Sequence, residues 1–273
     1  MIKNSIACLI FFLSAALCFP QTIHLLLRSA KALTGSQIVK AVWNLSLSDR
    51  ENFIYEKIMS GNIPDFQRNF VPITFNQTIN NINYNVTFFV MPDYFAVGSD
   101  SDYFLIPMTP ILAQRICNNL NCTLPTKKLV NEIWKNAKVK LEPAPISPDP
   151  AMTTVPIFWE HNQRVWQQRM AVIDSLPLGE LVAGHKKDVV ISNKIYGNVV
   201  TGRVVIYGWH KLNGVPIQPL YDGHTENYVD YSHGIRLVLD SVVVNGESRN
   251  IKRILQNDSL HILLSDEGKI TEP

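Results

Sequence analysis

The chain has 273 residues, of which 46% are hydrophobic and 18% charged, with a formal net charge of +2. This apolar fraction excludes an intrinsically disordered chain, and the lack of a heptad run or a G-X-Y period excludes coiled-coil and collagen-like proteins. A pI near 8.3 is too mild for a dedicated nucleic-acid-binding protein, so we expect no nucleic-acid partner.

The N-terminus has the pattern of a secretory signal. Lys3 precedes an apolar run over residues 6–17, which is short for a membrane span. The small residues Ala16 and Cys18 occupy positions −3 and −1 of a cleavage site before Phe19. The sequence therefore predicts a signal peptide over 1–18 and a secreted chain with no membrane span after cleavage.

Cysteine and asparagine usage is consistent with secretion. Cys117 and Cys122 are the two cysteines beyond the signal, and in an oxidising compartment they are expected to form a disulfide; two buried free thiols are the alternative. Asn-x-Ser/Thr sequons predict surface glycosylation sites at Asn44, Asn76, Asn85, Asn121 and Asn257.

The N-terminal part, residues 19–141, reads as helical and mixed. A capping box at Ser48 and Glu51 predicts a helix that ends near Gly61. Residues 71–75 and 84–90 are strand-like, with an Asn-rich turn between them. Thr109-Pro110 predicts the start of another helix, and Thr126 caps one that runs to about 137.

A proline-rich segment at 142–156 follows. It is read either as a linker between two lobes or as a surface loop within one domain. The remainder, 157–273, reads as β-rich, with strands over 189–195, 203–209, 215–220, 235–244 and 260–264. Asn213-Gly214 and Asn245-Gly246 favour hairpin turns. The predicted class is α+β, with a helical N-terminal part and a β-rich C-terminal part.

Four of the seven histidines, His185, His210, His224 and His233, lie at or just after the ends of strand-like runs. Loops on a rigid sheet are where sites form, so we expect at least two of these histidines to share one site. Lys186-Lys187 beside Asp188 reads as a charged turn, and Asp93, Asp100 and Asp102 as a solvated turn rather than a calcium loop.

Residues 221–236 are the segment richest in reactive side chains, and two chemistries fit them. In the first, His224, Asp230 and His233 ligate a catalytic Zn²⁺ and leave one position to water. In the second, Ser232 or a histidine acts as nucleophile or general base while Arg236 binds an anionic group. A buried polar turn with no function is the third reading.

Ser232-His233-Gly234-Ile235-Arg236-Leu237 resembles the L,D-transpeptidase stretch Ser-His-Gly-Cys-Ile/Val-Arg-Leu. The resemblance implies a secreted β-rich domain that acts on peptidoglycan, with an upstream histidine for which His210 or His224 could stand. The cysteine nucleophile of that family is missing here, so no nucleophile is carried over.

We therefore predict a secreted hydrolase or transferase that acts on an extracellular polymer, a glycan or peptidoglycan. The candidate catalytic residues are His210, His224, Asp230 and His233, with Arg236, Tyr231 and Trp209 in substrate binding. The alternative is a secreted binding protein whose recognition surface is formed by Trp209, Tyr228 and Tyr231. Histidines that meet at one pocket would favour the enzyme, and exposed aromatic side chains would favour the binding protein.

Overall fold

The computed structural model describes residues 21–196 and 202–273. The predicted signal peptide, 1–18, lies outside the described residues. Within the described ranges, no helix combines the length and the apolar character that a membrane crossing requires.

The described chain begins with two helices, α1 (Gly35–Val42) and α2 (Leu47–Met59), and a 3₁₀ turn at Asp65–Arg68. The start of α2 was predicted two residues late. Its N-cap is Ser46, whose hydroxyl accepts from the Asp49 N–H, and not Ser48. Both serines suit the N-cap position, so sequence alone does not choose between them.

A large antiparallel sheet joins the two halves of the chain. Strands β1 (Val71–Ile79) and β2 (Ile82–Val90) form the predicted hairpin, whose turn residues Asn80 and Asn81 both have positive φ. Strand β12 (Val238–Val244) pairs with β2, with β13 (Glu247–Asn250) and with the short β5 (Cys122–Thr123). Elements on both sides of the proline-rich segment therefore build one sheet.

The helices predicted in the middle of the chain are confirmed. Helix α3 (Pro110–Leu120) is capped by Thr109, and α4 (Lys127–Asn136) by Thr126. Two small pairings complete this part: β3 (Ala96–Ser99) with β4 (Asp102–Leu105), and β6 (Val139–Lys140) with β7 (Val182–Ala183).

The longest described helix, α5 (Val155–Met170), was missed from the sequence. It follows a 3₁₀ turn at Pro150–Thr153. The prolines of this region indicated irregular chain, but Pro156 lies in the first helical turn, where its missing N–H costs no hydrogen bond. The segment 142–156 thus leads directly into a helix.

A second sheet has the order β10-β9-β8-β11, formed by β8 (Lys187–Val189), β9 (Arg203–His210), β10 (Pro216–Thr225) and β11 (His233–Gly234). Strands β9 and β10 match predicted runs. Two other predicted strands, 189–195 and 260–264, are wrong over most of their length. Of the first only Val189 belongs to a strand, and 3₁₀ turns occupy 193–196 and 260–263, because short apolar runs do not distinguish a strand from a buried turn. Helix α6 (Ile251–Leu255) follows β13.

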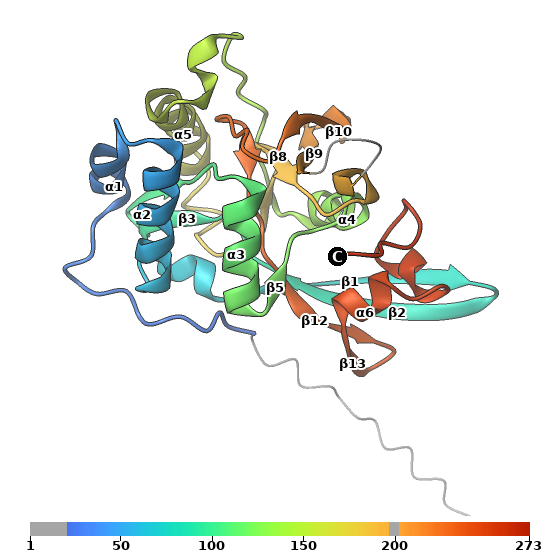
Figure 1. Cartoon of the computed structure of the whole chain (residues 1–273). Coiled ribbons are helices and arrows are strands. Elements are labelled where there is room, and N and C mark those ends of the chain that lie inside the picture. Colours follow the sequence, from blue (N-terminus) through green and yellow to red (C-terminus); the bar gives the residue numbers. More distant parts are fainter. Residues whose placement is uncertain (1–20, 197–201) are drawn as a thin grey trace, which may run out of the picture.

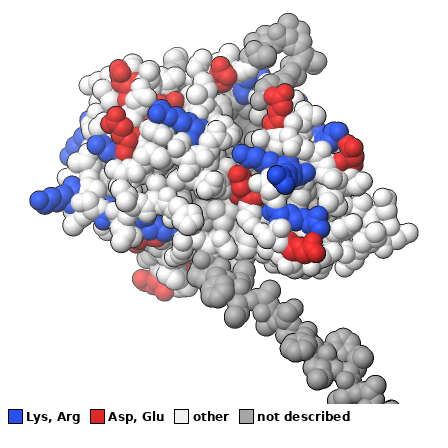
Figure 2. All heavy atoms as spheres, turned by 60° about the horizontal axis from the view of Figure 1, so that its bottom comes forward, with Lys and Arg blue, Asp and Glu red and all other residues white. Residues whose placement is uncertain are grey.

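The class is α+β, as predicted, with helices and strands mixed along the chain. Figure 1 shows α1, α2 and α5 gathered at one side and the β1–β2 hairpin extending away from the body. One large apolar core takes side chains from Ile38 in α1 to Leu264 near the C-terminus. On the face drawn in Figure 2, basic and acidic side chains are interspersed over the described surface.

The predicted Cys117–Cys122 bridge is not formed. Both cysteines are free and buried. Asn121 ends α3 in the left-handed conformation and turns the chain so that Cys122 enters β5, where its thiol donates to the Leu120 carbonyl. Burial raises the pKa of the Cys117 thiol to about 12, which keeps it protonated and unreactive at neutral pH.

We therefore expect no reaction of Cys117 or Cys122 with a thiol reagent in the native protein, and modification of both after denaturation without reductant. Mass spectrometry of the labelled protein measures this modification. Two unlabelled cysteines in the denatured, unreduced chain would instead establish the bridge.

The sequon asparagines suit glycosylation by their positions. The side chains of all five lie at the surface: Asn44, Asn76, Asn85, Asn121 and Asn257. Asn76 and Asn85 face each other across the β1–β2 hairpin, and the Asn85 amide donates to the Asn76 oxygen at 3.1 Å. A glycan on either asparagine would have to displace this bond.

Candidate functional site

The predicted site segment lies against β8. Strand β11 runs parallel to β8, with Lys187 opposite His233 and Asp188 opposite Gly234. Opposite residues project to the same face of a sheet, and successive residues project to opposite faces. Lys187 and His233 therefore share one face, and Asp188 projects from the other, which creates two separate polar clusters.

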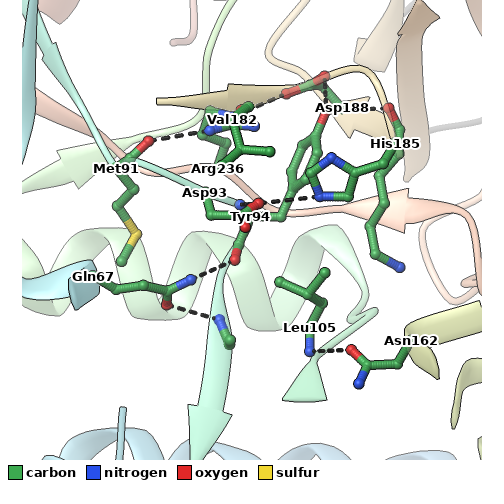
Figure 3. A network of polar contacts seen from close by, with 12 residues as sticks. Gln67, Met91, Asp93, Tyr94, Leu105, Asn162, Val182, His185, Asp188 and Arg236 are labelled. Atoms are coloured by element: carbon green, nitrogen blue, oxygen red, sulfur yellow. Dashed lines mark hydrogen bonds and ion pairs between the residues drawn. The ribbon is translucent and has the colours of Figure 1, made fainter. Parts of the chain in front are cut away.

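The first cluster, which we call the inner network, is buried, and Figure 3 shows its polar contacts. The Tyr94 hydroxyl donates to Asp188 Oδ2 at 2.7 Å. Gly234 leaves room for the Tyr94 ring, since an added Cβ would lie 2.5 Å from its Cδ1. On the same side, His185 Nε2 lies 3.1 Å from Asp93 Oδ1. The inner network consists of Asp93, Tyr94, His185, Asp188 and Arg236.

Arg236 stabilises the inner network and is not available to a substrate. Its side chain is completely buried. The guanidinium donates to the carbonyls of Met91 (3.1 Å) and Val182 (2.8 Å), and its Nε lies 3.7 Å from Asp188 Oδ1. The predicted role of Arg236 in substrate anchoring is therefore wrong, because sequence reveals the charge of this residue but not its enclosure.

The second cluster, which we call the acid–base cluster, is organised by Asp230. The buried carboxylate accepts the hydroxyl of Ser232 at 2.5 Å and its backbone N–H at 2.7 Å through Oδ1. Its Oδ2 accepts the Tyr228 hydroxyl at 3.2 Å and lies 3.9 Å from His233 Nε2. The acid–base cluster consists of Lys187, His224, Tyr228, Asp230, Ser232 and His233.

His224 and Tyr228 carry the acid–base cluster to the surface. Both side chains are half-buried, and their rings stack with centroids 3.9 Å apart and planes 16° from parallel. Partial burial lowers the pKa of His224, an effect that Asp230 opposes. His224 is therefore a neutral imidazole at pH 7. Burial, together with the Asp230 charge, raises the pKa of Tyr228 to about 12.

His233 lies beneath this stack. It is completely buried, and neither ring nitrogen has a hydrogen-bond partner among the described residues. Burial lowers the pKa of His233 to about 4 in spite of the neighbouring Asp230 carboxylate. His233 and Asp230 are both buried, so neither presents the exposed group that its predicted catalytic role requires.

Lys187, the first residue of β8, and the preceding Lys186 were not predicted as site residues. Lys186 is buried and donates to the Tyr231 carbonyl at 2.7 Å, and burial lowers its pKa to about 7. Lys187 is half-buried beside Asp230, and its pKa is lowered mainly by burial. Lys187 and Asp188 of the predicted charged turn in fact belong to strand β8, so Lys187 brings a cation to the acid–base cluster.

The zinc hypothesis finds no assembled ligand set. In the part of the chain that the structure describes, no three His, Cys, Asp or Glu side chains are grouped to hold a metal ion. His224 stacks flat on Tyr228, and His233 Nε2 lies 3.9 Å from Asp230 Oδ2. His224, Asp230 and His233 are thus neighbours in one cluster but do not converge on a point.

Other predicted site residues lie elsewhere. His210 is buried against Trp134 and within 3.3 Å of Asn131, away from the acid–base cluster. Trp209 and Tyr231 are buried too, and the Trp209 indole N–H donates to the His185 carbonyl at 3.1 Å. They form no exposed aromatic surface, and the predicted roles of Trp209 and Tyr231 in direct substrate binding are wrong for this reason.

Other partners in the site could not be foreseen. Asp93 and Tyr94 are more than 90 positions from the residues of segment 185–188 that they contact, and sequence shows no long-range pairing. Of the predicted solvated turn, Asp93 is instead buried, while Asp102 accepts the Ser36 hydroxyl at 2.6 Å. The sequence signal for Tyr228 was its place in the densest polar segment.

Protein-family models, curated proteins and solved structures were all compared with the chain, and none of them matches it.

Proposed function

We propose that the protein is a secreted hydrolase or transferase that uses the acid–base cluster on an extracellular polymer, a glycan or peptidoglycan. The observation that carries the proposal is the stack of half-exposed His224 on Tyr228, whose hydroxyl is bonded to the buried Asp230 carboxylate. This arrangement connects a surface base to a fixed negative charge. The secretory pattern of the N-terminus and the exposed sequons support the extracellular location.

His224 is the general base in this proposal. As a neutral imidazole it takes a proton from a water molecule in hydrolysis, or from an acceptor hydroxyl in transfer, while that oxygen attacks the substrate. The resulting imidazolium lies face to face with the Tyr228 ring, and a cation over an aromatic face is stabilised. The imidazolium then returns the proton to the leaving group, so the base is regenerated.

Asp230 and Lys187 supply the electrostatics. Asp230, fixed by the two hydrogen bonds from Ser232, holds the Tyr228 hydroxyl and favours a positive charge on the nearby His224. The half-buried Lys187 ammonium can stabilise negative charge that develops on the attacked group. Asp230 and Ser232 are positioning residues here, and His224 and Lys187 are the groups that reach the substrate.

Turnover by a histidine variant tests the proposal. The purified secreted protein is incubated with peptidoglycan and with glycans, and released products are separated by chromatography and mass spectrometry. We expect His224→Gln to lower turnover by at least about 100-fold, the usual loss when a general base is removed. His261→Gln, outside the cluster, should keep wild-type turnover. Equal turnover by His224→Gln and wild type would contradict the proposal.

A further inference from the structure

A cavity of about 400 Å³ opens beside the acid–base cluster, between the start of α2 and the start of α5. Its wall includes Trp43 and Arg50 on one side, Thr154 and Val155 on another, and Tyr228 on a third. No Asp or Glu side chain contributes to the wall. The volume lies at the small end of the range for sites that bind small molecules.

Arg50 is a largely buried cation that forms no direct ion pair among the described residues. Its side chain is only 6% exposed. Its guanidinium makes no hydrogen bond and lies within 4 Å of no carboxylate among the described residues, and its Cζ lies 5.1 Å from the centre of the Phe158 ring. Burial lowers the pKa of Arg50, which Glu51 only partly offsets. A largely buried charge is stabilised when an oppositely charged group pairs with it, so this guanidinium offers a favourable partner to an anion that enters the cavity.

The first turn of α5 adds backbone donors to the same cavity. The N–H groups at a helix start have no acceptor within the helix and carry a partial positive charge. The N-cap Thr154 does not satisfy them, since its hydroxyl instead donates to the Ala151 carbonyl at 2.7 Å. Phe158, over which Arg50 lies, belongs to this same helix, so the guanidinium and the helix start are close together.

We propose that this cavity binds an oxyanion, a carboxylate or a sulfate, held between Arg50 and the first turn of α5. Arg50 offers a planar pair of charged donors, and the helix start offers the uncapped N–H of Val155, which lines the cavity; the next residue, Pro156, has no N–H. Trp43, which is 42% exposed at the wall, presents a flat apolar face on which a sugar ring can stack. These features fit the carboxylate or sulfate group of an acidic sugar. A free inorganic anion is the second ligand that carries the same chemistry.

Tyr228 connects this cavity to the acid–base cluster, because it lines the one and donates to Asp230 in the other. The cavity would then select acidic units of a polymer for reaction at His224. This last step rests on the proposed function. The anion site itself does not, and it is tested by binding without any turnover.

The test measures binding of sulfate and of glucuronate by calorimetry, with chloride at equal ionic strength as the reference. All proteins carry Asn44→Gln, so that the extent of glycosylation at this cavity-lining residue does not differ between samples. Relative to this background, Arg50→Met should weaken binding at least about tenfold, the effect of losing a charged hydrogen bond. Arg115→Met, which removes an exposed arginine outside the cavity, should not weaken it.

Asn227→Asp gives an independent answer if Arg50→Met does not fold. This exposed residue lines the cavity, so a carboxylate there should repel the anion and weaken binding several-fold. A further loss of glucuronate but not sulfate binding in Trp43→Ala would identify the acidic sugar as the ligand. Equal losses would identify the free anion. Wild-type affinity in both Arg50→Met and Asn227→Asp, or no binding by the background protein, would overturn the proposal.

Discussion

Arg236→Met is expected to lower the free energy of unfolding by about 3–5 kcal/mol, the usual cost of removing one partner from a buried ion pair. The change leaves the buried Asp188 carboxylate with the Tyr94 hydroxyl as its main partner. It also removes the hydrogen bonds that the carbonyls of Met91 and Val182 accept from the guanidinium. Burial already raises the pKa of Asp188 to about 6 with Arg236 present. Urea denaturation followed by tryptophan fluorescence measures the loss.

Two further variants make this result specific to the inner network. Arg164→Met breaks a solvent-exposed pair with Glu160 and should change the unfolding free energy by no more than about 1 kcal/mol. Combining Arg236→Met with Asp188→Asn should recover part of the stability, because the unpaired buried charge is removed as well. An unfolding free energy of Arg236→Met within about 1 kcal/mol of wild type would refute the structural role.

Acid is expected to destabilise the protein between pH 6.5 and pH 4. Burial lowers the pKa of His233 to about 4, below that of an unfolded histidine. In this window the unfolded chain binds the proton and the folded chain does not, so stability falls as pH falls. For His233 alone the effect reaches about 3 kcal/mol at pH 4, and the lowered pKa values of His161, His185 and His210 add to it in the same direction.

The Asp188 carboxyl works in the opposite direction, since its raised pKa makes the folded state gain a proton first as pH falls towards 4. Glu51, Asp240 and Glu267, whose pKa values burial also raises, act in the same direction as Asp188. The histidine effects begin near pH 6.5, where histidines of the unfolded chain take up protons, so stability first falls with their sign. Denaturation midpoints of wild type and His233→Gln, measured from pH 4 to pH 7, isolate the one group. We expect a shallower profile for His233→Gln, and parallel profiles would show that His233 titrates normally in the folded protein.

Local signals in the sequence were sufficient for much of the fold. The Thr109 and Thr126 caps and the Asn245-Gly246 turn are decided by neighbouring residues, and all three are confirmed. The features that could not be predicted depend on contacts between residues far apart in the sequence. Pairing of β2 with β12 joins residues about 150 positions apart, and α5 is hidden behind Pro156, which suits a loop as well as a first helical turn.

The candidate site, like the fold, could be predicted only in part from the sequence. The density of polar residues from 221 to 236 indicated a cluster, and Asp230, Ser232 and His233 do meet there. Which of its members reach the surface was not readable, because burial depends on the whole fold. His233 and Arg236, which were predicted to be reactive groups, are therefore buried. Tyr228 instead links the surface to the interior through its hydrogen bond to Asp230.

The turnover number of Tyr228→Phe tests the central claim most directly. This variant keeps the ring that stacks on His224 and removes only the hydroxyl that donates to Asp230. We predict that kcat falls about 100-fold and that the acid limb of the pH–rate profile shifts, with a stability change of no more than about 1.5 kcal/mol. A Tyr228→Phe protein with wild-type kcat and an unshifted profile would contradict acid–base catalysis through His224, Tyr228 and Asp230.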